Sequence, residues 1–153
     1  MTAPAVSTSL WFATEAETAA TLYCSLIDDA RITNVFRERG DARGRAFIVE
    51  FELAGQRYSA MNGGPHYALT PAVSIVLSVD TQEEVDRLWF ALVSNGGSES
   101  RCGWLTDRFG LSWQIIPRAL PHLLQSDASG RVLQAMMSMI KIDIAALALA
   151  AHG

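Results

Sequence analysis

Along several short stretches of this chain, hydrophobic and polar residues alternate with the two-residue period of a half-buried β-strand. The clearest stretch is residues 45–53, RAFIVEFEL. One of its faces holds the apolar side chains of Phe47, Val49, Phe51 and Leu53, and the other holds Ile48, Glu50 and Glu52. Ala54-Gly55 then turns the chain into a hairpin partner, residues 56–62. Further strands are predicted at residues 9–12, 31–36 and 72–80.

Two stretches with the period of an amphipathic helix follow strands of this kind. The first covers residues 15–26, and Thr14 with Glu17 has the spacing of a capping box. The second has apolar residues at helical spacing, namely Val85, Leu88, Trp89, Leu92 and Val93. Thr81 with Glu84 forms the same box before it. In such a box each side chain binds a backbone N–H that the first helical turn leaves free, so both pairs predict a helix start.

The order strand, helix and three strands occurs twice along the chain. The second copy includes another hairpin, residues 99–107 with 110–117. A shift of 67 residues places Leu10 on Leu77, and a shift of 55 residues places Ser59 on Gln114. An internal duplication of one β-α-β-β-β unit accounts for the matched helix starts, hairpins and strand order together.

The pattern predicts an α+β protein of one domain, residues 1–153, with three parts. Paired β-α-β-β-β modules, residues 5–66 and 70–117, form curved antiparallel-rich sheets around a cavity, and residues 118–153 form a helical tail. The helix of each module covers the strongly apolar face of its sheet. The mixed face is left to curl around the cavity, and it carries Glu50, Ser59, Ser74, Ser78 and Gln114. Tail helices are predicted at residues 118–125, 131–140 and 143–151.

Composition and charge exclude several classes of protein. A net charge of −4 and a pI near 5.3 give no general attraction for a phosphate backbone, so we expect no nucleic-acid partner. The most apolar stretch, residues 142–151, is about half as long as a membrane span requires, and the N-terminus lacks a signal-peptide pattern. We therefore expect no membrane partner and a cytoplasmic location. Cys24 and Cys102 are too few for a disulfide framework and are expected to be reduced.

The repeat resembles the vicinal oxygen chelate superfamily, which includes glyoxalase I, extradiol dioxygenases and bleomycin-binding proteins. Five stretches resemble its PhnB-like branch more narrowly: LWF…AETAATLY, VEFELAGQRYSAMNGGPH, DTQEEVDRLW, CGWLTDRFGLSWQIIPR and KIDIAALALA. That branch is often labelled 3-demethylubiquinone-9 3-methyltransferase. The resemblance covers nearly the whole chain. It departs from the branch at Thr8, where a proline is usual, and at Ala13-Thr14, where an acidic residue and a glycine are usual.

The resemblance implies four positions for a divalent ion, because metal-dependent members bind one with side chains from the first and last strand of each module. The last-strand positions fall on Ser59 and Gln114, and the first-strand positions fall on Ser7 or Thr8 and on Ser74. Histidines and carboxylates are the usual ligands, since their lone pairs are charged or strongly basic. Hydroxyls and an amide form a poor cage, so we expect no metal and no other cofactor.

Gln114 interrupts the apolar run LSWQII, and its carboxamide needs a partner if it is buried. An unpaired buried amide costs about 1–3 kcal/mol. We favour the interpretation that Gln114 is a hydrogen-bonding group lining a cavity whose metal has been lost. The alternative is a glutamine that faces water on an open sheet.

The hairpin turn decides which residues share the face of Gln114. A symmetric turn places Trp104 opposite Trp113, and both then pack under the helix on the face of Cys102. Leu105 and Arg101 then lie on the face of Gln114, and a one-residue bulge reverses the assignment. Asp107 is interpreted as the hydrogen-bonding residue of the turn, with Gly110 at a positive φ.

Three residues are candidate catalytic groups. Glu50 lies on the face of Ser59 and suits a general base, although a solvated charge pair on the sheet is the favoured alternative. His66 lies in the NGGP loop and titrates near neutral pH, with an exposed loop histidine as the alternative. Cys102 follows Arg101, whose charge favours a thiolate, but small buried cysteines are common.

The leading hypothesis is a metal-free protein of this fold that binds a small organic molecule. The expected ligand-binding residues are Thr8, Glu50, Ser59, Met61, Ser74, Ser78, Arg101 and Gln114. The alternatives are a metal-dependent lyase or oxidoreductase of the glyoxalase or dioxygenase type, a methyltransferase, and a non-catalytic sequestration protein. Methionines in the tail and apolar helix faces favour a homodimer.

Overall fold

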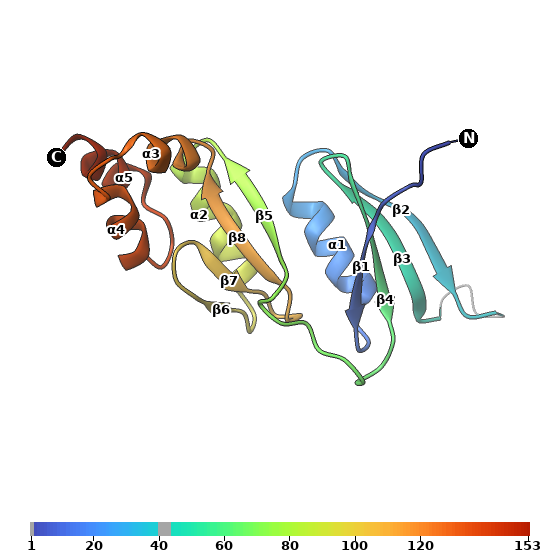
Figure 1. The fold of residues 1–153 in the computed structure, drawn as a ribbon. Coiled ribbons are helices and arrows are strands. Elements are labelled where there is room, and N and C mark those ends of the chain that lie inside the picture. The colour runs from blue at the N-terminus through green and yellow to red at the C-terminus, as the bar shows by residue number, and fades with distance from the viewer. Residues whose placement is uncertain (1, 40–43) are drawn as a thin grey trace. The chain divides into compact units, whose positions relative to one another are not determined.

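The computed structural model describes residues 2–39 and 44–153, and its elements fall into two compact units, one ending at Leu69 and the other beginning at Thr70 (Figure 1). The first unit contains β1 (Thr8–Phe12), α1 (Ala16–Leu26), β2 (Ala30–Arg37), β3 (Ala46–Leu53) and β4 (Gln56–Asn62). The second contains β5 (Ser74–Val79), α2 (Gln82–Val93), β6 (Ser98–Glu99), β7 (Trp104–Thr106), β8 (Ser112–Pro117), α3 (Leu120–Ser126), α4 (Arg131–Ser138) and α5 (Ile144–His152). These elements confirm the predicted α+β class, with two β-α-β-β-β modules followed by helices.

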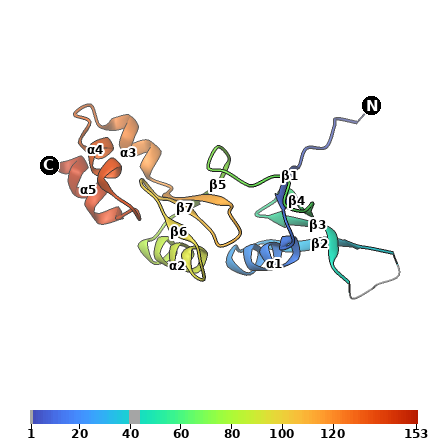
Figure 2. The same ribbon diagram turned by 90° about the horizontal axis from the view of Figure 1, so that it is seen from below.

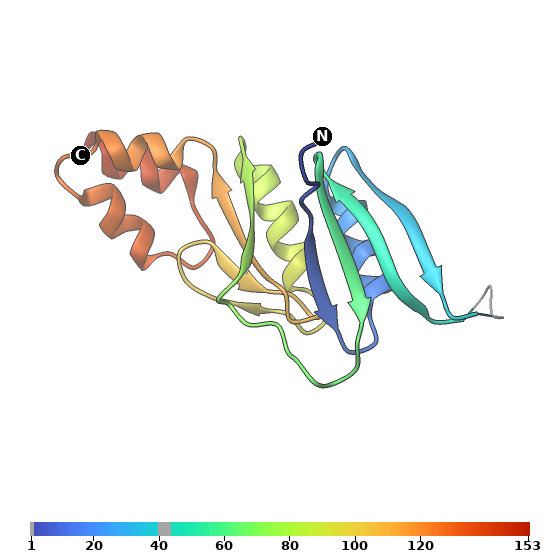
Figure 3. The ribbon, with the colours of Figure 1, turned by 45° about the vertical axis from the view of Figure 1, so that its right-hand side comes forward.

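In the first unit the strands lie in the order β1-β4-β3-β2, and α1 packs against one face of the sheet (Figure 3). β1 and β4 are parallel, and the other neighbours are antiparallel. The buried layer between helix and sheet consists of Ala16, Ala19, Ala20, Tyr23, Leu10, Phe12, Val49, Phe51 and Tyr58. Burying each large side chain stabilises the fold by about 1.5–3 kcal/mol. The small residues on α1 let the helix approach the sheet closely.

The first predicted capping box does not form. The N-cap residue is Glu15, and its side chain makes no hydrogen bond to the backbone of the first turn of α1. Instead Asn62, at the end of β4, accepts a hydrogen bond from the backbone N–H of Ala16 through Oδ1 at 2.9 Å. Glu17 pairs with Arg37 of β2, with N–O distances of 2.6 and 2.9 Å. The arginine holds the pKa of Glu17 below its ordinary value, because it donates hydrogen bonds to the charged form.

A bulge changes the predicted faces at the beginning of β3. The β2–β3 register shifts between Phe36, which pairs with Ile48, and Arg37, which pairs with Ala46. Ala46 is buried and Phe47 is 49% exposed, so the expectation that Phe47 faces the core is wrong. The extra residue in the bulge breaks the alternation at this point.

The second unit repeats the plan with the strand order β5-β8-β7-β6, and α2 lies on one face of this sheet (Figure 2). Here the capping prediction is confirmed at the N-cap, since Thr81 Oγ1 accepts from the backbone N–H of Glu84 at 3.2 Å. The Glu84 carboxylate binds Arg87 rather than reaching back to the cap. The residues buried beneath α2 include Trp113, Ile115 and Leu105.

The strand registers support the internal duplication. Ser9 pairs with Ser59 between β1 and β4, and Val76 pairs with Gln114 between β5 and β8. Shifts of 67 and 55 residues carry the first pair onto the second. The first and last strands therefore pair with the same relative register in both units.

The tail packs as three short helices around a buried cluster formed by Leu120, Val132, Ile142 and Leu147. Its predicted second helix ends earlier than expected, at Ser138. The next two carbonyls, of Met139 and Ile140, instead accept hydrogen bonds from the backbone N–H groups of Cys102 and Gly103 at 2.9 and 2.8 Å. The tail is thus joined to the β6–β7 loop of its own unit. Among the described helices, none is long and apolar enough to cross a membrane.

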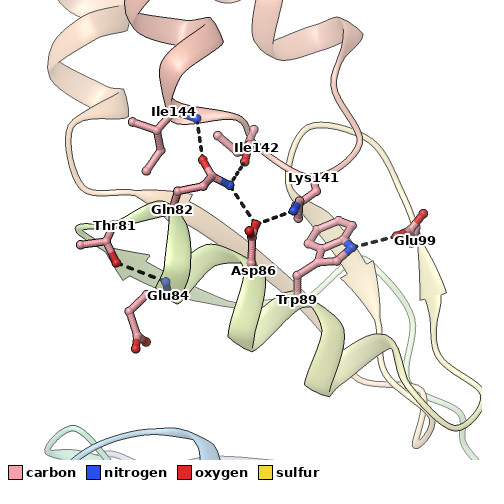
Figure 4. Close-up of polar contacts among 9 residues, drawn as sticks. All are labelled: Thr81, Gln82, Glu84, Asp86, Trp89, Glu99, Lys141, Ile142 and Ile144. Carbon is pink, nitrogen blue, oxygen red and sulfur yellow. Dashed lines mark hydrogen bonds and ion pairs between the residues drawn. The ribbon is translucent and has the colours of Figure 1, made fainter.

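Polar contacts also attach the tail to α2 (Figure 4). The Gln82 side chain donates to the Ile142 carbonyl at 3.0 Å and accepts from the Ile144 backbone N–H at 2.9 Å. Asp86 accepts from Gln82 at 2.9 Å and pairs with Lys141. The hydrogen bond from Lys141, and to a smaller extent the one from Gln82, holds the pKa of Asp86 below its ordinary value. The tail therefore contacts both the helix and the loop of the second unit.

Candidate functional site

The face of the first sheet that points away from α1 is ordered in rows that run across the strands. Strand partners stand side by side on one face, so the registers define each row. The apolar row consists of Trp11, Met61, Ile48 and Phe36. The polar row, two residues further along each strand, consists of Ser9, Ser59, Glu50 and Asn34. A charged row follows, with Arg57, Glu52 and Arg31.

Trp11 is fixed at the end of the apolar row. Its indole N–H donates to the Gly64 carbonyl at 2.9 Å, and its ring meets Tyr67 edge to face, with centroids 4.9 Å apart. A Cβ on Gly63 would lie 2.3 Å from the indole ring, so residue 63 must be glycine for the ring to occupy this place. The NGGP loop after β4 therefore fixes the position of Trp11, through the Gly64 carbonyl and the space left by Gly63.

The structure places three of the predicted ligand-binding residues on this face: Glu50 and Ser59 in the polar row, and Met61 in the apolar row. Glu50 is exposed, and among the described residues its carboxylate takes part in no ion pair or side-chain hydrogen bond. Thr8 differs from the expectation. It pairs with buried Tyr58 and lies on the same face of β1 as the buried Leu10 and Phe12, so Ser9 takes the place beside Ser59. His66 lies exposed in the loop after β4, outside the rows.

In the second unit, Gln114 and Ser74 come together on the face away from α2. Gln114 Nε2 donates to Ser74 Oγ at 2.9 Å, across the parallel strands β5 and β8. Gln114 is half-buried rather than fully exposed. The carboxamide that interrupts the apolar run therefore has a partner in the first strand of its own module, 40 residues earlier in the chain.

The hairpin register corrects the predicted positions of the two tryptophans. Trp104 pairs with Gln114, and Leu105 pairs with Trp113. Trp113 is fully buried under α2, whereas Trp104 shares the face of Gln114. The predicted pairing of Trp104 with Trp113 is wrong because the loop has three residues, not two, between the paired ends Asp107 and Leu111.

Asp107 occupies the turn as expected, and Gly110 has a φ of 92°. Asp107 Oδ1 accepts from the backbone N–H groups of Phe109 at 2.8 Å and Leu111 at 3.1 Å. Asp107 Oδ2 accepts from Trp113 Nε1 at 2.9 Å. This buried carboxylate therefore holds the turn and the core tryptophan together.

A row of hydroxyls also crosses this face of the second sheet. The hydroxyl row consists of Ser74, Ser112, Thr106 and Ser98. The Oγ atoms of Thr106 and Ser112 lie 3.5 Å apart. Ser78 lies exposed further along β5, beside Ile116. The sequence shows a hydroxyl residue on each of these strands. Only the strand registers show that the four residues stand side by side.

The remaining candidates, Arg101 and Cys102, lie in the loop between β6 and β7. Arg101 is exposed, and its carbonyl accepts the backbone N–H of Trp104 at 3.1 Å. Cys102 has a φ of 59°, and its backbone N–H binds the Met139 carbonyl. Neither residue lies on a strand. Cys102 therefore contributes to tail attachment through its backbone.

The donors at the register positions do not fit a divalent transition metal. Ser9 and Ser59 supply neutral hydroxyls in the first unit, and Ser74 and Gln114 supply a hydroxyl and an amide in the second. Zinc, iron and nickel prefer imidazole, thiolate or carboxylate ligands. In the part of the chain that the structure describes, no three histidine, cysteine, aspartate or glutamate residues group together as a metal site.

Several solved structures have a similar fold. Among solved structures, the PhnB protein of Bacillus cereus, provisionally described as a 3-demethylubiquinone-9 3-methyltransferase, is 28% identical over 73% of this chain and 98% of its own, with a TM-score of 0.67. A Pseudomonas aeruginosa protein is 21% identical over 75% of this chain and 98% of its own, with a TM-score of 0.59. The fosfomycin resistance protein FosX of Listeria monocytogenes, in a mutant form complexed with Mn(II) and 1S,2S-dihydroxypropylphosphonic acid, is 16% identical over 82% of this chain and 99% of its own, with a TM-score of 0.56. None of the proteins with curated descriptions matches this chain.

A family model gives the assignment. The model described as 3-demethylubiquinone-9 3-methyltransferase matches residues 4–116, which include both β-α-β-β-β modules except for the last residue of β8. The tail, with its KIDIAALALA stretch, lies beyond the matched range. The chain therefore belongs to the family described as 3-demethylubiquinone-9 3-methyltransferase, in the PhnB-like branch of the vicinal oxygen chelate superfamily.

Proposed function

We propose that this protein binds small organic molecules without a metal ion, on the sheet face that carries Ser59 in the first unit and, separately, on the sheet face that carries Gln114 in the second unit. The observation that carries the proposal is the hydrogen bond from Gln114 to Ser74 beside Trp104. Among the described residues, this bond leaves Gln114 Oε1 as an acceptor and the Ser74 hydroxyl proton as a donor. A fixed donor and acceptor next to an aromatic side chain are typical of sites for small organic ligands.

The experiment is a screen of small organic molecules by thermal shift, followed by native mass spectrometry of each hit. We expect hits that bind the wild type, and that lose most of their stabilising effect in a Gln114→Leu variant. Gln125→Leu is the matched control, because Gln125 is exposed on α3 and the change in composition is identical. If the Gln114→Leu and Gln125→Leu variants bind the hits equally well, Gln114 is not part of the binding site.

The metal-dependent alternative makes a different prediction. An enzyme of the glyoxalase or dioxygenase type purifies with a stoichiometric divalent ion or becomes active when one is added. The hydroxyl and amide donors support the opposite expectation, less than about one tenth of an ion per chain after incubation with Zn²⁺, Mn²⁺, Ni²⁺ or Fe²⁺. Elemental analysis after desalting measures this ratio directly.

The methyltransferase alternative comes from the description of the family and of the Bacillus cereus protein. S-adenosylmethionine sites commonly use a glycine-rich turn between a strand and helix of a parallel sheet. In both sheets here only the pairs β1–β4 and β5–β8 are parallel. We expect no heat on titration with S-adenosylmethionine, and saturable binding would favour this alternative over ours.

A further inference from the structure

We infer that the ligand bound by the first unit is an amphipathic organic amine, with its apolar body on the apolar row and its ammonium group at Glu50. The inference rests on the proposed function, and it names the class of ligand for one of the two faces. Three features carry it: the spacing of the rows, the fixed aromatic end of the apolar row, and the unpaired charge of Glu50.

The rows give the site its dimensions. Neighbouring strands are about 4.8 Å apart, so a row across four strands is about 14 Å long. Rows on the same face are two residues apart, which is about 7 Å along the strands. A ligand with one or two fused rings and a short chain ending in a polar group therefore spans the apolar row and the polar row together.

The aromatic side chains at the two ends of the apolar row suit contact with a flat or aliphatic group of a ligand. Trp11 is held by its hydrogen bond to Gly64 and by contact with Tyr67, which is itself 69% exposed. Phe36, at the other end of the row, is 46% exposed. A side chain that is already immobilised loses little conformational entropy on binding, so contact with it contributes more to affinity.

The charges near the polar row favour a cation. Arg31 forms an ion pair with Glu52 at 3.2 Å, and Arg57 donates to the Val6 carbonyl at 3.2 Å. Glu50 lies between Ser59 and Asn34 in the polar row, and among the described residues no cation is paired with it. An ammonium group would supply Glu50 with a charge-assisted hydrogen bond, whereas a carboxylate would be repelled.

The test compares three probes that share a naphthalene ring: 2-(1-naphthyl)ethylamine, 2-(1-naphthyl)ethanol and 1-naphthaleneacetate. The dissociation constant of each is measured by NMR titration of the tryptophan indole N–H signals, with Trp11→Phe used to identify the Trp11 signal. We expect the amine to bind about tenfold more tightly than the alcohol, and the carboxylate to bind most weakly. The advantage of the amine over the alcohol falls as salt is added.

Two charge variants separate the inference from a general charge effect. Glu50→Gln is expected to weaken amine binding about tenfold and to leave binding of the alcohol unchanged. Glu52→Gln is the matched control, since it removes the same charge from the same strand, and we expect less than a twofold effect on the amine. Trp11 shifts should accompany binding of the amine in the wild type and in the control.

The outcomes distinguish this inference from the proposed function. If the alcohol or carboxylate binds as tightly as the amine, or if Glu50→Gln and Glu52→Gln have equal effects, the amine inference is wrong and small-molecule binding stands. If other compounds bind only through Gln114 and none of the probes shifts Trp11, the inference is likewise wrong. If no small organic molecule binds either face, both proposals fail.

Discussion

Gly63 lies beneath the indole of Trp11, where a Cβ would come within 2.3 Å of ring carbon Cζ2 and 2.4 Å of Cη2. The ring is also held by its hydrogen bond to Gly64 and its contact with Tyr67. A larger residue at 63 must therefore displace the indole or the backbone of the loop. One glycine without a side chain thus determines where the aromatic end of the apolar row lies.

We expect Gly63→Ala to lower the free energy of unfolding by about 1–3 kcal/mol, because the added methyl group overlaps a fixed ring. In a Trp11→Ala background the same change should cost much less, since the space is then open. Urea denaturation of the two single variants and the double variant completes the cycle. Equal costs in both backgrounds would mean that the indole is not the obstacle.

Asp107 gives a second prediction for a single residue. Its carboxylate is 3% exposed and accepts hydrogen bonds from two backbone N–H groups and from the indole of Trp113. Asp107→Asn turns an amide N–H₂ group toward one of these donors, so we expect a loss of about 2–3 kcal/mol in unfolding free energy. Asp80→Asn, at an exposed pair with Arg118, is the control and should cost less than about 1 kcal/mol. Denaturation followed by tryptophan fluorescence compares them, and similar losses would contradict the prediction.

Single residues also show where sequence reasoning reached its limit. The turn at Asp107 and Gly110 was predictable because its signal lies within four residues. The hydrogen-bond partner of Gln114 was not predictable. Ser74 is 40 residues away in the sequence, and the parallel pairing of β5 with β8 brings the two side chains together. The face of Trp104 depended on whether the loop has two or three residues, since a shift of one residue exchanges the two faces of a strand.

At the scale of elements, the two helix starts show the same difference between local and distant contacts. Thr14 and Thr81 stand at the same spacing from a glutamate, yet only Thr81 caps its helix with its side chain. The N–H of Ala16 binds Asn62 instead, which also donates to the Ala46 carbonyl at 2.8 Å. The sequence pattern located both helices correctly because their apolar period is local. It could not identify a cap supplied by another strand.

The attachment of the tail to α2 leads to a prediction about pH. Hydrogen bonds from Lys141 and then Gln82 lower the pKa of Asp86, so the folded state favours its charged form. The resulting stability is fully present above the unfolded pKa, about 3.9, and is lost as the pH falls through the lower folded value. We therefore expect tail attachment to be constant between about pH 5 and 8, and to weaken only in stronger acid.

Hydrogen exchange measures this attachment directly. At pH 7 we expect Asp86→Ala to raise the exchange rate of the Ile144 and Leu147 amides several-fold, and to leave the sheet amides of β3 unchanged. Glu84→Ala is the control, because Glu84 lies on the same helix and its carboxylate binds Arg87 of that helix rather than a residue of the tail. A similar increase in both variants would assign the effect to loss of charge on α2 rather than to the tail contacts. In the wild type the same amides should become less protected below about pH 4.

At the scale of the whole molecule, two copies of one unit have kept their backbone and changed the chemistry of one face. The face under each helix stays apolar, because it must exclude water. The other face carries the Glu50 carboxylate and an apolar row in the first unit, and a carboxamide and the hydroxyl row in the second. Periodicity predicts the shared backbone well, since burial constrains it. It says little about the faces that point away from the helices, because packing in the core does not constrain the residues there.

The tail gives the last prediction, a homodimer formed through its exposed apolar side chains. Leu149 is 74% exposed, Met137 57% and Leu133 48%, although all three lie on helices of the tail. Exposed apolar side chains that gather on neighbouring helices are typical of an interface between chains. We expect a mass of two chains by native mass spectrometry, and a shift toward one chain when Met137 and Leu149 are both changed to Lys. Val6→Lys changes an equally exposed apolar residue outside the tail and should leave the dimer intact. A single-chain mass for the wild type across the micromolar range would contradict the prediction, and dissociation by the Val6 variant would place the interface elsewhere.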